Sequence, residues 1–407
     1  MSKDLVSIVN SLLRGSYEKK FHGYDPYDLK AHPFFIDLIK WGNQSRFGEI
    51  VREIVLELTY HYPKQARSLF NIKPDQNSKA LGLIGTTCIE LSLLENFDNE
   101  LIVKSLDSIQ SLLKKYETNT EPGIGWGYPF DWQSTDLIPA QTPNGIVTTA
   151  VGEFYWTSYQ ISKNEKDLET CVSIAKFLAN LPIDRLTESK ICFSYIPHYQ
   201  NHVHNLNLFV ADFLIKVGME VNYQNWIDLG AKAVNYTLAD QHDNGAFDYN
   251  GPPEKPQNFV DNYHTGFVLR MLGSIYHFTE REDVKVSLEK GLSYYLENFF
   301  LEDGTPKLKP DRIYRVDIHS AAEAINCLTF LAPFNSKAFP QATKVLNWTI
   351  DNLYDQKNQD FYYGILKSRF TGRVFKSEIK YMRWAQAWML RSLSRYILYS
   401  ENNRIIL

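Results

Sequence analysis

Apolar residues recur every three to four positions along most of the chain, with polar residues between them. This spacing places apolar side chains on one face of an α-helix, and the patterned segments are too long for β-strands. Clear examples are DLETCVSIAKFLANLP (167–182), WIDLGAKAVNYTLADQ (226–241) and VKVSLEKGLSYYLENFF (284–300). The pattern therefore predicts an all-α protein.

The predicted helices alternate with short stretches that are rich in Gly, Asp, Asn, Pro and aromatic residues. A new helix begins after each stretch, and these starting points recur at intervals of roughly 55 to 70 residues, which suits one helical hairpin per repeat. The starting points lie near Lys79, Thr148, His204, His264, His319 and Tyr381.

A further helical pattern covers residues 47–58 and brings the predicted total to about twelve helices, enough for six hairpins. We therefore predict an (α/α)6 toroid, a closed ring of six hairpins, as a single domain over residues 1–407. Residues 1–45, which include FHGYDPYDLKAHP, would form an N-terminal strap or lid. An open helical solenoid and a ring with fewer hairpins remain alternatives; solenoid repeats are usually shorter.

Composition narrows the function classes. The formal net charge is −4, from 43 basic and 47 acidic residues, and no basic run is dense enough to follow a phosphate backbone, so nucleic acid is not an expected partner. No apolar run is long enough to span a bilayer, and the N-terminal residues do not resemble a signal peptide, which predicts a cytoplasmic protein. The four scattered cysteines suit reduced, buried thiols.

In a closed ring, the loops that lead into the inner helices meet at one mouth. Aromatic residues make up 14% of the chain and gather in these loops. Sugars have apolar faces and polar rims, so aromatic rings beside amides, histidines and charged groups match a saccharide ligand. The residues expected to bind substrate are Trp126, Tyr128, Trp132, Gln133, His202, Tyr263, Lys307, His319 and Arg383.

Carboxylates in the same loops suggest glycosidic chemistry, which commonly uses two carboxyl groups. Asp131 lies among aromatic residues in GIGWGYPFDWQST, where desolvation would raise its pKa, so we expect it to be the acid. Asp261 or Asp317 would be the second carboxylate. A helix-capping role for the loop acids is an equal alternative, because Asp before a helix accepts hydrogen bonds from its free N–H groups.

Histidines offer a second chemistry, because imidazole transfers protons near neutral pH. His204 and His264 are the candidates for this role. The HVH motif at 202–204 with His264 and His319 also raises the possibility of zinc, but a short HxH without a third ligand is a weak signal. We predict no metal and no cofactor.

A set of short segments is distributed along nearly the whole chain: FHGYDPYD, KALGL, GWGYPFDWQS, VHNLNL, DNYHTGF, YYLENFFLEDGTPK and VDIHSAAEAI. Together they resemble the pattern of a family of cytoplasmic proteins associated with bacterial and archaeal polysaccharide biosynthesis, which is similar to the six-hairpin glycosidase superfamily. The resemblance implies an (α/α)6 fold, a role in glycan production, and association with polysaccharide-biosynthesis proteins. It supplies no established reaction.

Three functions follow from the sequence. The first is a cytoplasmic carbohydrate-active enzyme of the glycoside hydrolase type. The second is a sugar or uronic-acid epimerase, or a lyase, that uses His as its base. The third is a non-catalytic glycan-binding or scaffold protein, which would keep the aromatic pocket but lack a facing pair of acids.

Overall fold

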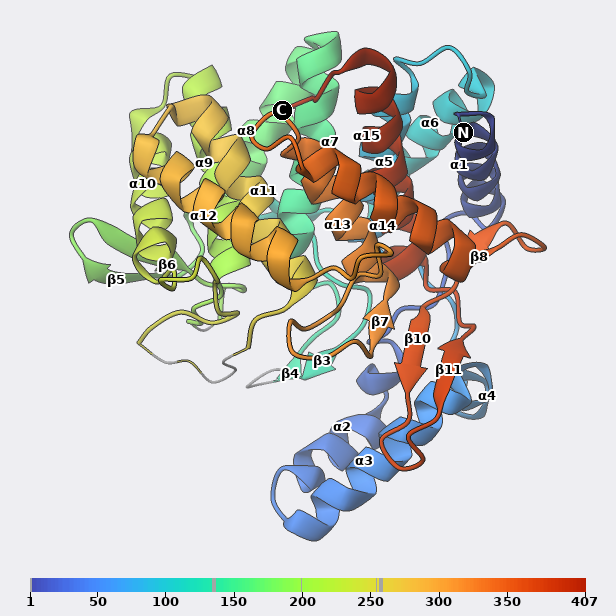
Figure 1. The fold of residues 1–407 in the computed structure, drawn as a ribbon. Helices are drawn as coiled ribbons and strands as arrows, with labels where there is room; N and C mark the ends of the chain where they lie inside the picture. Colours follow the sequence, from blue (N-terminus) through green and yellow to red (C-terminus); the bar gives the residue numbers. More distant parts are fainter. Residues whose placement is uncertain (1, 134–136, 199, 254, 256–258) are drawn as a thin grey trace.

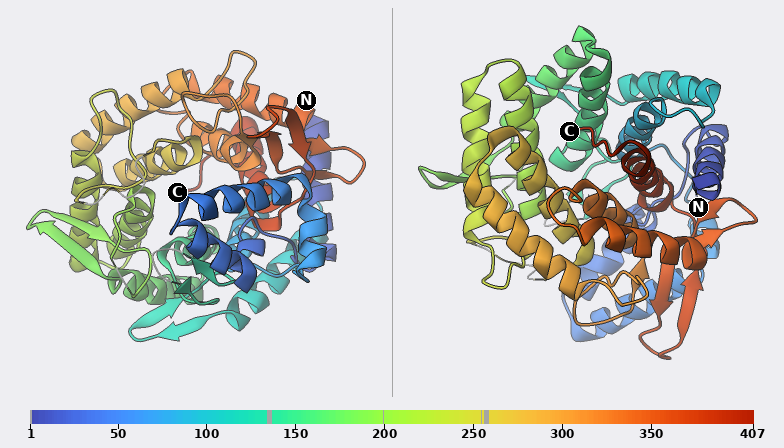
Figure 2. Two further views of the ribbon diagram at one scale, coloured as in Figure 1. Left: turned by 90° about the horizontal axis from the view of Figure 1, so that it is seen from below. Right: turned by 45° about the horizontal axis from the view of Figure 1, so that its top comes forward.

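The computed structural model describes residues 2–133, 137–198, 200–253, 255 and 259–407, and most of them are helical. Within this part of the chain, twelve α-helices form two concentric layers of a closed ring, seen from its mouth in Figure 2, left. The inner layer is α5 (Ser78–Leu91), α7 (Gly145–Ser162), α9 (His204–Glu220), α11 (Asn262–Thr279), α13 (Ile318–Phe330) and α15 (Trp388–Asn402). The outer layer is α1 (Ser2–Glu18), α6 (Asn99–Lys115), α8 (Glu165–Ala179), α10 (Gln224–Ala239), α12 (Glu282–Asn298) and α14 (Ala338–Leu353).

The inner helices are enclosed on all sides. Each packs against the next around the ring, and α15 closes it by packing against α5. Every position of α5 and of α13 is buried, whereas outer helices such as α6 bury only one face. Helices that are buried all round belong to the centre of a fold, and amphipathic helices belong to its surface.

Ion pairs join neighbouring inner helices inside the ring. Arg391 of α15 donates to Glu90 of α5 at 2.7 Å, and Arg270 of α11 donates to Glu323 of α13 at 3.0 Å. Lys216 of α9 donates to Glu153 of α7 at 2.6 Å. A buried charge is tolerated only when it is paired, so these contacts constrain which inner helices lie side by side.

The described parts of the connections from outer to inner helices lie at one end of the ring, which is its mouth (Figure 1). They carry short antiparallel strands, one three-stranded sheet in the order β11–β10–β7, and a π-helix, η2 (Met382–Ala387), that leads into α15. The strands are β1 (Thr118–Thr120), β2 (Gly123–Gly125), β3 (Trp132–Gln133), β4 (Leu137–Ile138), β5 (Ile183–Thr187), β6 (Lys190–Phe193), β7 (Val316–Asp317), β8 (Tyr354–Asp355), β9 (Asp360–Phe361), β10 (Gly364–Lys367) and β11 (Val374–Ser377).

The first connection carries a small helical module that projects below the ring and crosses part of its mouth (Figures 1 and 2). It contains η1 (Leu29–Ala31), α2 (Pro33–Gly42), α3 (Arg46–His61) and α4 (Pro63–Leu69). Its helices pack mainly on one another around Leu29, Phe35 and Leu38. This module, which spans 29–70, includes the helix that the sequence assigned to the ring over residues 47–58.

The twelfth ring helix is instead α1, inside the segment predicted to be a strap or lid. Its Val9, Leu12 and Leu13 are buried in the main core, whereas Val51, Val55 and Leu56 of α3 pack against the small core of the module. A helical pattern identifies a helix but not the surface it packs against, so both segments looked equally suitable.

The predicted all-α (α/α)6 architecture is confirmed. The four cysteines are buried and unpaired. A membrane-spanning helix would need a long apolar stretch, and none of the helices in the described residues has one.

Close packing of the inner layer predicts a strong effect of added volume at Gly82 in α5. A Cβ atom there would lie 2.5 Å from the Ala150 carbonyl oxygen of α7. We expect Gly82→Ala to lower the free energy of unfolding by about 1–3 kcal/mol, because backbone must shift to admit the methyl group.

The matched control is Gly15→Ala in α1, where no atom lies within 4 Å of the added methyl. Alanine is the better helix former, so this variant should gain about 0.4–1 kcal/mol. Urea denaturation measures both values. Equal stabilities of the two variants would contradict the close approach of α5 and α7.

Candidate functional site

A cavity of about 270 Å³ lies at the mouth of the ring, where several of the loops converge. Most of its wall is aromatic. The lining residues are Tyr27, Lys79, Tyr128, Phe130, Trp132, Ile146, Tyr195, Asn201, Val203, Asn205, Tyr249, Phe259, Tyr263, His264, Phe267, His319, Arg383 and Trp384.

Pairs of stacked rings give this wall flat, rigid faces. Tyr128 and Phe130 stack with ring centroids 5.4 Å apart, and Tyr249 and Phe259 stack at 5.0 Å. The hydroxyl groups of Tyr128 and Tyr195 lie 3.4 Å apart. Apolar faces with hydroxyl groups at their edges can stack on a sugar ring and hydrogen-bond its rim.

His264, in the first turn of α11, is held by a carboxylate. Its Nδ1 lies 2.8 Å from Oδ2 of Asp261, the N-cap residue of the same helix. A carboxylate only accepts hydrogen bonds, so it places the imidazole proton on Nδ1 and leaves Nε2 as the basic nitrogen. The same carboxylate stabilises the imidazolium that forms when Nε2 takes a proton.

His319, in the first turn of α13, lies beside it in the cavity. The rings of His264 and His319 both contact Tyr263, with centroids 4.4 Å and 4.8 Å from its ring. Burial lowers the pKa of His319 well below its usual value, and the charges of Lys79 and Arg383 lower it further. His319 is therefore neutral at neutral pH.

Arg383, in η2, is fixed by a bidentate ion pair. Its Nε and Nη2 donate to the two oxygens of Asp25 at 2.6 Å and 2.8 Å. Burial alone would lower the pKa of Arg383, but the charge and hydrogen bonds of Asp25, together with the nearby Tyr128 and Tyr27, outweigh burial and raise it. Because Asp25 belongs to the first mouth loop, this pair fastens that loop, and with it Tyr27, to the cavity wall.

The three predicted catalytic carboxylates do not face one another across this cavity. Asp131 accepts a hydrogen bond from the Ala140 backbone N–H at 2.7 Å within its own loop. Asp261 and Asp317 are the N-cap residues of α11 and α13, as the capping alternative expected. Asp317 is fully buried and also accepts from Nε1 of Trp384 at 3.3 Å. None of these carboxylates, nor any other within the described residues, lines the cavity.

Some of the predicted substrate-binding residues line the cavity and the others do not. Tyr128, Trp132, Tyr263, His319 and Arg383 line the cavity. Trp126 and Lys307 do not line it: Trp126 is fully buried and donates from Nε1 to the Leu113 carbonyl, and Lys307 donates to the Pro310 carbonyl. Gln133 belongs to β3, and its side chain lies outside the described part of the structure.

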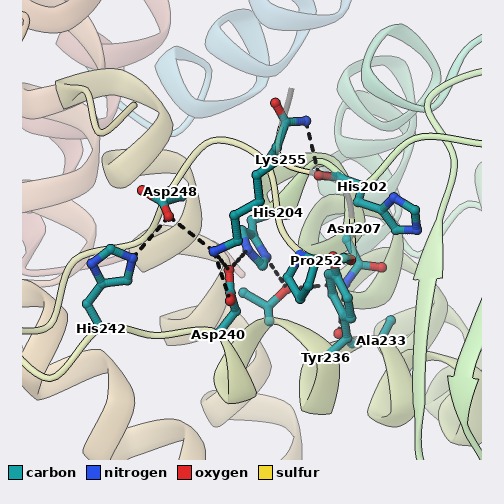
Figure 3. Close-up of polar contacts among 12 residues, drawn as sticks. His202, His204, Asn207, Ala233, Tyr236, Asp240, His242, Asp248, Pro252 and Lys255 are labelled. Atoms are coloured by element: carbon teal, nitrogen blue, oxygen red, sulfur yellow. Dashed lines mark hydrogen bonds and ion pairs between the residues drawn. The ribbon is translucent and has the colours of Figure 1, made fainter. Parts of the chain in front are cut away.

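His202 and His204 lie outside the cavity, in the polar network of Figure 3. Nε2 of His204 lies 2.9 Å from Asp240, which Lys255 also binds, and Nε2 of His202 lies 2.8 Å from Asp184. Their partners differ, so the HVH motif does not bring its imidazoles to one point. Among the described residues, no group of three or more His, Cys, Asp or Glu side chains is placed to hold a metal ion.

The predicted site residues omit ten polar or aromatic residues of the wall: Tyr27, Lys79, Phe130, Tyr195, Asn201, Asn205, Tyr249, Phe259, Phe267 and Trp384. The repeat marked Lys79 only as the start of a helix, yet Lys79 is the second residue of α5, as His319 is the second of α13. Position within the repeat was therefore a usable signal for Lys79.

Comparisons with known proteins give a match for the fold only. No model of a protein family matches the sequence, and no curated protein matches it. Solved structures do match. A cellobiose 2-epimerase from Bacillus thermoamylovorans is similar with a TM-score of 0.61 and 9% identity, over 80% of this chain and 88% of that one.

Two further similar structures belong to enzymes of other kinds. A family 76 α-mannanase from Bacteroides thetaiotaomicron has a TM-score of 0.59 at 12% identity, over 80% of this chain and 87% of its own. An unsaturated glucuronyl hydrolase specific for heparin has a TM-score of 0.55 at 14% identity, covering 79% and 86%. The chain therefore shares the (α/α)6 fold of these three structures. At these identities the fold does not select a reaction.

The depressed pKa of His319 predicts a pH dependence of stability. In the folded protein His319 stays neutral, whereas in the unfolded chain it takes up a proton below about pH 6.5. The unfolded state then binds more protons, so this group lowers the free energy of unfolding as the pH falls, by at most about 1.4 kcal/mol per pH unit.

We expect the loss of stability between pH 7 and pH 5 to be about 1–2 kcal/mol smaller in His319→Gln than in the wild type. Urea denaturation at the two pH values measures it for both proteins. The same loss in both would show that His319 takes up its proton as readily in the folded protein as in the unfolded chain.

Proposed function

We propose that this protein is a carbohydrate-active enzyme that moves a proton at the carbon next to a sugar carbonyl, as a sugar epimerase or isomerase does. One observation carries the proposal. His264 and His319 lie in the same aromatic cavity, each with a defined acceptor near Nδ1, and no described carboxylate lines that cavity. Hydrolysis would need two carboxyl groups there, which weighs against the hydrolase hypothesis.

The proposed chemistry needs a base, a way to stabilise the charge that develops, and a cavity that holds the open-chain sugar. Nε2 of His264 removes the proton from the carbon beside the carbonyl, and Asp261 stabilises the resulting imidazolium. The carbonyl oxygen gains negative charge as the carbon–hydrogen bond breaks, and cavity donors such as Arg383 meet that charge. Return of the proton to the opposite face of the same carbon gives the epimer, and return to the neighbouring carbon gives the isomer.

His319 has a complementary part in this proposal. The Trp384 carbonyl oxygen lies 3.4 Å from its Nδ1 and only accepts hydrogen bonds, so Nε2 carries the lone pair. A neutral imidazole in this form accepts the hydrogen of a substrate hydroxyl, which orients the sugar and carries protons between neighbouring oxygens.

The neighbouring structures support the substrate class. They include the cellobiose 2-epimerase, a D-mannose isomerase, and enzymes that cleave glycans. The cytoplasmic setting and the association with polysaccharide-biosynthesis proteins stay predictions from the sequence.

Hydrogen exchange tests the reaction. We expect the purified protein in D2O to exchange the C2 hydrogen of a reducing sugar, followed by proton NMR with D-mannose, cellobiose and D-glucuronate. His264→Asn should lower the exchange rate at least about 100-fold, because it removes the base. Asp131→Asn is the control and should leave the rate unchanged.

Each result discriminates between hypotheses. Loss of turnover in Asp131→Asn, with activity kept in His264→Asn, would overturn the proposal in favour of hydrolysis. Sugar binding without exchange by the wild type would overturn it in favour of a glycan-binding protein.

The carboxylate behind His264 gives a second test, Asp261→Asn. Asn caps a helix about as well as Asp, so the backbone N–H of His264 keeps its acceptor and the stability should change by less than about 1 kcal/mol. The exchange rate should fall at least about tenfold, because the amide no longer stabilises the imidazolium. A variant with wild-type exchange across the pH range would remove Asp261 from the positioning role.

A further inference from the structure

The most unusual group in the cavity is the lysine at its inner end. Lys79 is 7% exposed and lines both the cavity at the mouth and a second cavity of about 40 Å³ deeper in the ring. Its ammonium lies 5.8 Å from the ring centre of Phe267 and 5.3 Å from that of Trp388. These are the faces of aromatic rings, which attract a cation but do not neutralise it.

The ammonium has no ion pair with, and no hydrogen bond to, any residue that the structure describes. The two acids whose charges affect it most are already paired, Glu323 with Arg270 and Asp25 with Arg383. Burying a charge without a partner costs free energy. An unpaired ammonium in the wall of a cavity is therefore suited to bind an anion that enters the cavity.

The rest of the lining points the same way. Besides Lys79, the described lining has one other fixed charge, the guanidinium of Arg383, which is also positive, and it has no carboxylate. Its neutral polar groups include five tyrosine hydroxyls and the amides of Asn201 and Asn205, which can both donate and accept hydrogen bonds. A cavity whose fixed charges are all positive suits a ligand that carries negative charge.

We propose that Lys79 binds an anionic substituent of the sugar, so that the substrate carries a carboxylate or a phosphate group. This rests on the proposed function for the site, and it names the class of sugar that enters it. The anion supplies the partner that Lys79 lacks among the described residues, and the ammonium fixes the sugar's orientation relative to His264 and His319.

The protonation of Lys79 follows from the same geometry. Burial lowers its pKa to about 7, and the positive charge of Arg383 contributes. An anion beside the amine favours the charged form and raises that pKa. At pH 8 the free protein therefore carries Lys79 mostly as the neutral amine, and binding of the anion draws up to one proton from solution.

Titration calorimetry tests the proposal with three probes, D-glucuronate, D-glucose 6-phosphate and D-glucose. We expect one or both anionic sugars to bind at least about tenfold more tightly than D-glucose, because a charged hydrogen bond is added. The comparison between D-glucuronate and D-glucose 6-phosphate shows which anion the site takes. Lys79→Met should remove this preference, so that this variant binds the anionic sugars no more tightly than it binds D-glucose.

The matched control is Lys344→Met, which removes an exposed lysine on the outer helix α14 and should keep the preference. Proton uptake needs no variant. At pH 8, the heats measured in HEPES and in Tris should differ for the anionic sugar by the number of protons taken up multiplied by the difference between the ionisation heats of the two buffers, and should agree for D-glucose.

Equal affinities for all three sugars in the wild type, or no proton uptake with the anionic ones, would overturn the role of Lys79. These measurements record binding alone. Anion binding without hydrogen exchange would support the role of Lys79 and refute only the proposed reaction. Hydrogen exchange of D-mannose without any preference for anionic sugars would support the reaction and refute the role of Lys79.

Discussion

The whole structure depends on closure of the inner helical layer. The last inner helix, α15, must pack against the first, α5, and the ion pair from Arg391 to Glu90 lies at that junction. Ser394 of α15 donates to the same carboxylate. Two charges that are buried in one contact are stable only together, so the junction favours a closed ring over an open stack of hairpins. Closure is also what turns six separate loops into one mouth.

The pairing of buried charges also distinguishes the two cations of the cavity wall. Arg383 has its carboxylate, Asp25, which ties the first mouth loop to the segment before α15. Lys79 has none among the described residues, although the two positive charges influence one another. Arg383 therefore stabilises the wall of the cavity, and Lys79 is the cation that we propose binds the ligand. The two histidines also differ in their partners, because Nδ1 of His264 lies against the Asp261 carboxylate whereas Nδ1 of His319 lies against the Trp384 carbonyl.

Much of this cavity could be predicted from the repeat. His264, His319 and Tyr263 occur at the starts of inner helices, and closure of the ring brings such starts together. The same reasoning failed for His204, because its ring turns to Asp240 on the outer side, a contact that no periodicity reveals. The sequence also predicted that residues 1–45 form a strap or lid and that residues 47–58 form a ring helix, whereas α1 lies in the ring and α3 in the module at the mouth. Both have the pattern of an amphipathic helix, and only the available surfaces distinguish them.

The sequence by itself determined the helices, the six-fold repeat and the aromatic character of the mouth, because periodicity and composition are local properties of the chain. Tertiary structure decided which side chains share the cavity. The sequence suggested Asp131 as a catalytic acid with Asp261 or Asp317 as the second carboxylate, yet Asp131 bonds within its loop, and Asp261 and Asp317 each cap their own helix. In the sequence, Lys79 is one polar residue at the start of a helix, and only the closed ring shows that it is buried in the cavity wall. The partner that a charge finds depends on contacts between distant segments, and these exist only after the ring has closed.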